Sequence, residues 1–182
     1  DIGCGNMGVK LDLKRDDADV SSILDLIEQE IQFGLSKVNK KAPKDDPIFN
    51  ADEWGAYPDE VNIGKLKEKA REQFGTVGSG NHYVDVLVDE EDYLWLGNHF
   101  GSRRFGYETA SGFMNLSQNV DWYGKPRQVE GLLDLRQPVG EAYFAAMNLA
   151  GRYAWRSREW VLHHLVSKLG VQILDTVHNN HN

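Results

Sequence analysis

Residues 5–14 read GNMGVKLDLK, and this stretch decides the expectation for the fold. From Met7 to Leu13 every second residue is apolar, while the residues between them are small or polar. A period of two predicts a strand with one buried face. The strand leaves a glycine turn, DIGCG at residues 1–5, so this turn feeds directly into a sheet.

Three helices are expected further along the chain. They cover roughly residues 16–33, 63–74 and 138–169, and each is followed by a glycine that ends it. Asp16 and Asp17 are the expected caps of the first helix, because their side chains can accept hydrogen bonds from its first free N–H groups.

Strands and irregular segments lie between these helices. We expect strands at residues 82–88 and 93–96, joined as a hairpin, and at residues 171–177. Residues 37–47 predict a charged loop, and residues 107–136 have little periodicity and predict irregular structure. The sequence therefore predicts an α+β fold with mixed sheets and flanking helices.

The composition limits the class of protein. A chain of 182 residues predicts one domain. The net charge of -8 argues against a globally basic nucleic-acid binder, but it leaves room for a local basic or metal-loaded groove. The single cysteine excludes an internal disulfide framework and fits a reducing compartment. Because we find neither a signal peptide nor an apolar run long enough to span a bilayer, we expect a cytoplasmic protein without a membrane segment.

Four polar clusters stand in glycine-rich turns or at strand ends. They are DIGCG at 1–5, GSGNH at 78–82, NHFGSRRFG at 98–106 and HNNHN at 178–182. Together they hold the cysteine, Asp1 and four of the six histidines, which is the ligand set of zinc, manganese or iron. Their spacing is not that of a zinc finger, and a site drawn from distant segments is typical of a catalytic metal.

The first three clusters also have plainer interpretations, whereas the two imidazoles of HNNHN have no obvious packing use. Cys4 between two glycines could be a small buried residue, and His82 or His99 could serve as hydrogen-bonding partners at a hairpin end. His163 and His164 lie inside the last helix and are interpreted as packing and surface residues.

The arginines and glycines near these clusters leave alternatives open as well. Arg103 and Arg104, after Ser102, could bind phosphate or could pair with surface carboxylates. Glycines 75, 78 and 80 could cradle a phosphate, although they match no standard nucleotide motif.

Taken in order, the clusters resemble the RtcB family of RNA ligases, which act in tRNA splicing and RNA repair. The matching segments are DIGCG at 1–5, GTVGSGNHY at 75–83, HFGSR at 99–103, GEAYFAAMNLAGRYAWRSR at 140–158 and HNNHN at 178–182. The resemblance runs along the whole chain and implies an RtcB-like catalytic domain. It also implies that residues 1–182 are the central, metal-binding part of a longer protein, incomplete at both ends.

The resemblance implies a ligase that depends on GTP and on two Mn²⁺ ions. Such an enzyme joins RNA ends bearing a 3′-phosphate or a 2′,3′-cyclic phosphate to 5′-hydroxyl ends. A histidine attacks GTP to form a histidine–GMP adduct, and that histidine is expected downstream of Asn182. The implied partners are broken or spliced RNA, with tRNA as one candidate, and an accessory activating protein.

The resemblance also implies roles for individual residues. The implied metal ligands are the carboxylate of the first motif, its thiol and three histidines: Asp1, Cys4, His82, His99 and His181, with His178 as the alternative to His181. The thiol of Cys4 is expected to contact both ions. Residues expected to contact the guanylate or the phosphates are Asn81, Asp85, Ser102 and Arg103.

Two departures from the family pattern accompany these roles. Asp85 stands where the family commonly has glutamate, and Phe100 and Arg104 replace a serine and a glycine of the family motif. Two rival functions stay open: a metal-dependent phosphoesterase that acts without GTP, and a catalytically inactive paralogue that binds metal or nucleotide.

Overall fold

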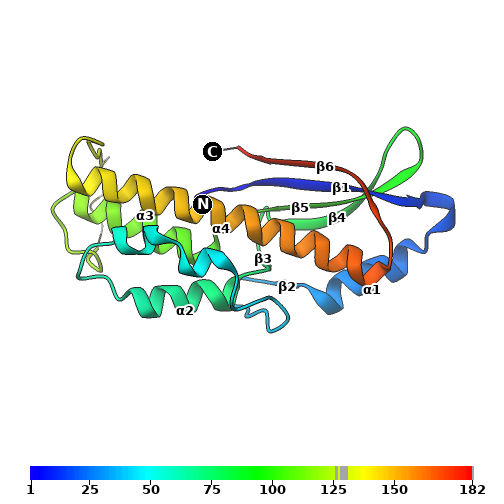
Figure 1. Ribbon diagram of the computed structural model, residues 1–182, viewed down its shortest axis with the longest axis horizontal. Coiled ribbons are helices and arrows are strands. Elements are labelled where there is room, and N and C mark those ends of the chain that lie inside the picture. The colour runs from blue at the N-terminus through cyan, green and yellow to red at the C-terminus, as the bar shows by residue number, and fades with distance from the viewer. Residues whose placement is uncertain (126, 128–130, 182) are drawn as a thin grey trace.

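A four-stranded antiparallel sheet in the order β4–β5–β1–β6 brings the two ends of the chain side by side (Figure 1). The computed structural model describes residues 1–125, 127 and 131–181. The strands of this sheet are β1 (Gly5–Lys14), β4 (Tyr83–Val88), β5 (Tyr93–Phe100) and β6 (Ile173–Asn180). A short parallel pair, β2 (Gln32–Phe33) with β3 (Thr76–Gly78), forms a second sheet.

Over the part of the chain that the structure describes, four α-helices accompany the sheets, and the α+β class is confirmed. They are α1 (Val20–Glu30), α2 (Ile63–Gln73), α3 (Arg103–Ser117) and α4 (Pro138–Leu169). Short 3₁₀ turns, η1 (Arg15–Asp17), η2 (Pro47–Asn50) and η3 (Asp52–Ala56), connect some of these elements. Among the described residues, no helix has the combination of length and apolar character that crossing a membrane requires.

The pairing of β1 with its neighbours sorts side chains onto two faces. Asn6 lies opposite His99 of β5 and Asn179 of β6, so these three share one face. Met7 and Val9 point the other way and are buried with apolar residues of β5, as the alternation in residues 5–14 predicts. The first of these faces carries the polar motifs.

The 32-residue helix α4 organises the core because it contacts both halves of the molecule (Figure 1). Its buried residues recur at helical spacing from Ala146 to Val166. The first half of this stripe packs with α2, α3 and the 3₁₀ turns, and the second half packs on the buried face of the sheet with α1. The helix therefore holds the sheet and the helical layer in one fixed arrangement.

Two sequence predictions of helices were wrong. The first helix is capped by Asp19, not by Asp16 or Asp17, because the Asp19 carboxylate accepts hydrogen bonds from the N–H groups of Ser21 and Ser22. That helix ends before residue 33, since Phe33 pairs in β2. The predicted irregular segment 107–136 begins inside α3, although residues 126 and 128–130 lie outside the described residues.

The periodicity of α3 is hidden because its buried face is built partly from small residues. Phe105, Gly106, Thr109, Gly112 and Phe113 are buried at helical spacing. A side chain at residue 112 would overlap the ring of the buried Trp122, which packs directly against this glycine. Glycine is therefore required for packing at a point where it lowers the helix propensity of the sequence.

The remaining predictions differ from the structure at the ends of elements. The hairpin strands run from residue 83 to 88 and from 93 to 100, so the second extends beyond the predicted 93–96 and includes His99. The last strand starts at Ile173 and continues through Asn180. The predicted helices at 63–74 and 138–169 are confirmed to within one residue.

Candidate metal centre

The turn at residues 1–4 is fixed against the end of β5. The backbone N–H of Cys4 donates to the carbonyl of Asp1 at 3.1 Å, and Gly3 adopts a left-handed φ of 70°. The N–H of Ser102 donates to the carbonyl of Ile2 at 3.1 Å. These bonds hold the side chains of Asp1 and Cys4 next to the strand that carries His99.

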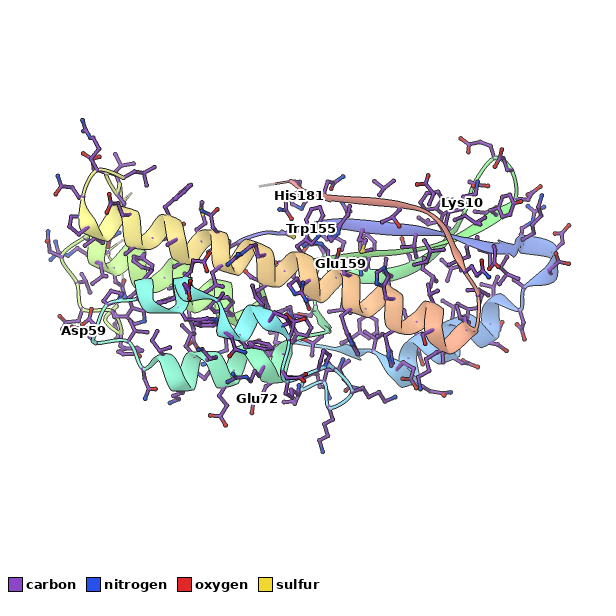
Figure 2. All side chains as sticks on the ribbon, viewed as in Figure 1. Lys10, Asp59, Glu72, Trp155, Glu159 and His181 are labelled. Carbon is purple, nitrogen blue, oxygen red and sulfur yellow. The ribbon has the colours of Figure 1, made fainter. Side chains whose placement is uncertain are left out.

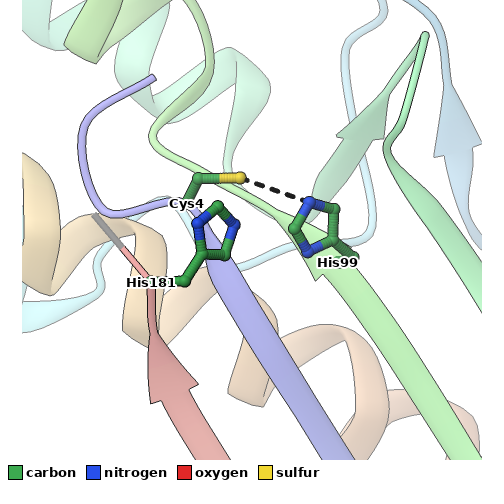
Figure 3. Close-up of side chains that lie close together, drawn as sticks. All are labelled: Cys4, His99 and His181. Atoms are coloured by element: carbon green, nitrogen blue, oxygen red, sulfur yellow. Dashed lines mark hydrogen bonds between the residues drawn. The ribbon is translucent and has the colours of Figure 1, made fainter.

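One group of donor atoms consists of Cys4, His99 and His181 (Figure 3). Their ligand atoms all lie within 4.8 Å of one another. The Cys4 Sγ is 3.4 Å from His99 Nε2, and the rings of His99 and His181 stack with centroids 5.2 Å apart. Three soft or borderline donors from three different strand ends thus converge on one point.

A second group consists of Asp1, Cys4 and His82, again with ligand atoms within 4.8 Å of one another. The Asp1 carboxylate is 2.9 Å from His82 Nε2, and the Cys4 Sγ is 3.9 Å from the same nitrogen. Cys4 belongs to both groups. A thiolate shared by two donor sets fits a pair of transition-metal ions bridged by sulfur.

Strand parity separates the two histidines near the end of β6. Asn179 lies on the same face as His99, and two residues further on His181 stacks on the His99 ring. His178 points to the opposite face, where its ring stacks on Trp155 of α4 and its Nε2 accepts a hydrogen bond from Arg158 at 3.0 Å. The structure therefore brings His181 to the cluster and does not bring His178 there.

Two residues that the sequence analysis did not select orient His99. Asn6 Oδ1 lies 2.9 Å from His99 Nδ1, and because the amide oxygen only accepts, His99 Nδ1–H is the donor. This tautomer leaves the lone pair of Nε2 facing Cys4. Tyr83 also stacks on the His99 ring, with centroids 5.4 Å apart, and donates its hydroxyl to Asn6 at 3.4 Å. Asn6 and Tyr83 both lie opposite His99 on neighbouring strands, and this cross-strand register is the signal that identifies them.

The electrostatics of the cluster suit a cation. Burial lowers the pKa of His82, and the charge of Arg103 lowers it further. Burial also lowers the pKa of His99, and His181 adds to this effect. Both shifts favour the neutral imidazole, which is the form that binds a metal ion. Burial raises the pKa of the Cys4 thiol. A divalent cation would compensate for this, because a metal bond favours the thiolate. The donor set and its charge therefore fit a metal ion.

The residues expected to contact guanylate and phosphate lie around this cluster in different environments. Asn81 is exposed, with Nδ2 3.5 Å from His99 Nε2. Ser102 is buried at the start of α3, and the half-buried Asp85, whose pKa is raised by burial, packs over Gly97 on the sheet face that carries His99. These placements leave Asn81 as the most accessible of the three.

The two neighbouring arginines have separate roles. Arg103 is 7% exposed and adopts a left-handed φ of 58°, and its guanidinium donates to Thr76 Oγ1 and to the carbonyl of Gly34. Arg104 is exposed and pairs with Glu108, as the surface alternative predicts. A buried guanidinium in a strained backbone position beside the cluster is typical of functional sites.

Gly101 leaves the space that the Asp1 carboxylate occupies, because a Cβ at this position would overlap all three carboxylate atoms. We predict that Gly101→Ala displaces Asp1 from His82 and weakens Mn²⁺ binding about 10-fold or more, as the loss of a supporting contact does in other metal sites. The measurement is calorimetric titration of the apoprotein with Mn²⁺. The control is Gly151→Ala, since a Cβ there meets no atom within 4 Å. Equal affinities in the two variants would contradict the placement of Asp1.

His178 predicts a pH dependence of the metal-free protein. Burial, and then the charge of Arg158, lower its pKa from 6.5 to about 3. Between pH 6.5 and about 3, the unfolded chain therefore binds a proton at His178 that the folded chain does not bind. The free energy of unfolding should fall as the pH drops from about 6.5, by up to about 1.4 kcal/mol per pH unit from this residue.

Denaturant titrations across this pH range, on the wild type and on His178→Gln, measure this contribution. The glutamine retains an oxygen that accepts from Arg158 but does not titrate. The difference in unfolding free energy between the two proteins should therefore change with pH. A constant difference would show that His178 titrates normally in the folded state.

Comparison with known proteins identifies the family. A family model described as "tRNA-splicing ligase RtcB" matches residues 1–181. The tRNA-splicing ligases RtcB of Thermococcus kodakarensis and Methanococcus maripaludis are 24% and 27% identical, each over 90% of this chain and 43% of the relative. The RNA-splicing ligase RtcB of Escherichia coli is 28% identical over 65% of this chain and 32% of the relative. This chain spans less than half the length of these relatives, and it belongs to the RtcB family.

Proposed function

We propose that residues 1–182 form the two-metal centre of an RNA ligase. The reaction joins RNA 3′-phosphate or 2′,3′-cyclic phosphate ends to 5′-hydroxyl ends, using GTP and Mn²⁺ and passing through a histidine–GMP adduct. The observation that supports it best is the position of Cys4, which belongs to both groups of converging donor atoms. The relatives' names supply the substrate class, RNA and tRNA in particular.

The donor atoms divide between two proposed ion positions. Asp1, Cys4 and His82 would hold one ion, and Cys4, His99 and His181 the other. Bound Mn²⁺ would neutralise phosphate charge and orient the attacking and leaving oxygens. The ions would also supply the local positive charge that a protein with a net charge of -8 needs in order to bind RNA.

The chain's own residues would prepare this centre for its substrates. Asn6 fixes the tautomer of His99, and Asn81 is exposed beside the cluster, where its amide would bind the guanylate. The Arg103 guanidinium and His82 Nδ1 both pack against Gly78, so the guanidinium lies close to a proposed ligand. From there Arg103 would place its charge near the phosphates. We assign the guanylylated histidine to a segment outside residues 1–182.

Two further properties are proposed on the same ground. The lone free thiol, Cys4, has to stay reduced in order to ligate, which is consistent with a cytoplasmic location. An accessory activating protein is proposed from the resemblance to the family.

Covalent labelling of the natural full-length protein tests this function. Incubation with GTP and Mn²⁺ should add the mass of one GMP, bound through an acid-labile bond to histidine, and the adduct should be absent when Mn²⁺ is omitted. Intact mass spectrometry measures this. A protein that binds Mn²⁺ and hydrolyses phosphate esters but never acquires GMP would instead be a metal-dependent phosphoesterase. A protein that binds Mn²⁺ and does neither would be an inactive paralogue.

A further inference from the structure

Arg158 is a charged residue with no solvent exposure, located in the second half of α4. Its helix position is itself fixed, because Asn98 Nδ2 of β5 donates to the Arg158 carbonyl at 3.0 Å. Trp155, one turn earlier on the helix, lies near the end of β6 that carries His181 (Figure 2). The side chain of Arg158 thus extends from the core helix toward the strand ends that form the cluster.

The guanidinium of Arg158 donates to four acceptors on three segments. Its Nη1 donates to the carbonyl of Gly3 at 2.7 Å and to that of Phe100 at 2.6 Å. Its Nη2 donates to Asn180 Oδ1 at 2.6 Å, and its Nε donates to His178 Nε2 at 3.0 Å. A buried cation that is paired with oxygen and nitrogen acceptors on every side is held in one orientation.

Three of these four acceptors are neighbours of the proposed ligands in the sequence. Gly3 precedes Cys4, Phe100 follows His99, and Asn180 precedes His181. A lysine would carry the same charge, but its single nitrogen cannot span acceptors on three segments in the way that the planar fork of arginine does. The geometry therefore depends on the shape of the group as well as on its charge.

We propose that Arg158 is a positioning residue of the metal centre, which fixes the relative placement of Cys4, His99 and His181 from the opposite side of the sheet. This inference rests on the proposed metal site. It goes further because it assigns the assembly of three ligand-bearing segments to one residue outside the ligand set. Without the planar guanidinium, the three segments should shift independently, and the Cys4 sulfur should move away from the position that both donor groups share.

Cobalt binding to Arg158→Lys in the natural full-length protein tests the proposal. Co²⁺ bound to a thiolate gives a sulfur-to-metal charge-transfer band, which reports directly on the Cys4 bond. The variant should bind Co²⁺ about 10- to 100-fold more weakly, the usual cost of removing a supporting group, and should have a reduced band at saturation. Arg156→Met is the matched control, because Arg156 lies on the same helix but pairs with Asp46 near the surface. This control should keep the wild-type affinity and band.

A wild-type band and affinity in folded Arg158→Lys would overturn the proposal, because the charge alone would then suffice. A loss of thermal stability with an unchanged band at saturation would also overturn it, since the role would then be only structural. If the lysine variant does not fold, Asn180→Ala decides: a smaller loss of affinity supports the proposal and wild-type binding refutes it. Absence of Co²⁺ binding in the wild type would overturn the proposed metal site itself.

Discussion

Replacing Cys4 by alanine should abolish Mn²⁺ binding at both proposed positions. The sulfur lies within 4.8 Å of the donor atoms of Asp1 and His82 on one side and of His99 and His181 on the other. Removing any other ligand would weaken one position first, whereas removing the shared ligand weakens both. Elemental analysis of the purified full-length protein should show two manganese ions per wild-type chain and none in Cys4→Ala.

The control for this prediction separates ligation from packing. Cys4 is 4% exposed, so its side chain also fills space. Cys4→Ser preserves most of that volume but replaces the thiolate by a weak ligand. If Cys4 only fills space, the serine variant should retain its metal. If Cys4 binds the ions, both variants should lose them while the circular dichroism spectrum of the apoprotein stays unchanged. Intact manganese stoichiometry in folded Cys4→Ala would rule out the shared ligand.

The second large effect is expected at His181. His181→Ala should weaken Mn²⁺ binding at the position proposed between His99 and residue 181 by at least about 100-fold. This loss is larger than the loss expected when a group that only supports a ligand is removed. His178→Gln should retain the ion, since His178 faces α4 and accepts from Arg158. Calorimetric titration with Mn²⁺ distinguishes the two variants.

His163→Ala is a further control for this pair, because this residue lies exposed on α4. The His163→Ala variant should bind Mn²⁺ with the same affinity as the wild type. Loss of the ion in His178→Gln, together with its retention in His181→Ala, would mean that β6 pairs with β1 in a register shifted by three residues, so that His178 takes the place of His181. That result would also remove the acceptor assigned to Arg158 Nε.

Much of the fold could be predicted from local patterns. The alternation in residues 5–14 predicts β1 correctly, and Pro138 and Gly170 bound α4 as expected. The helix α3 was missed because tertiary packing requires glycine at Gly112, which local propensity disfavours. Asp19 caps α1 in place of Asp16 or Asp17, a difference of less than one turn that several adjacent aspartates do not resolve.

The candidate site could be predicted only in part, for a similar reason. The order of the motifs indicates which segments meet, but the choice between His178 and His181 depends on how β6 pairs with β1, a contact between distant segments. Asn6 acquires its role only when it lies opposite His99. Arg158 is one of several arginines on α4, and nothing in its local sequence distinguishes it from the surface residue Arg156.

A crystal structure of the full-length protein with Mn²⁺, determined with anomalous diffraction at the manganese edge, tests the central claim most directly. The account predicts two anomalous peaks, both bonded to the Cys4 sulfur. One should lie between Asp1 and His82, and the other between His99 and His181. A single peak, or two peaks of which either lacks a bond to Cys4, would contradict the shared two-metal centre.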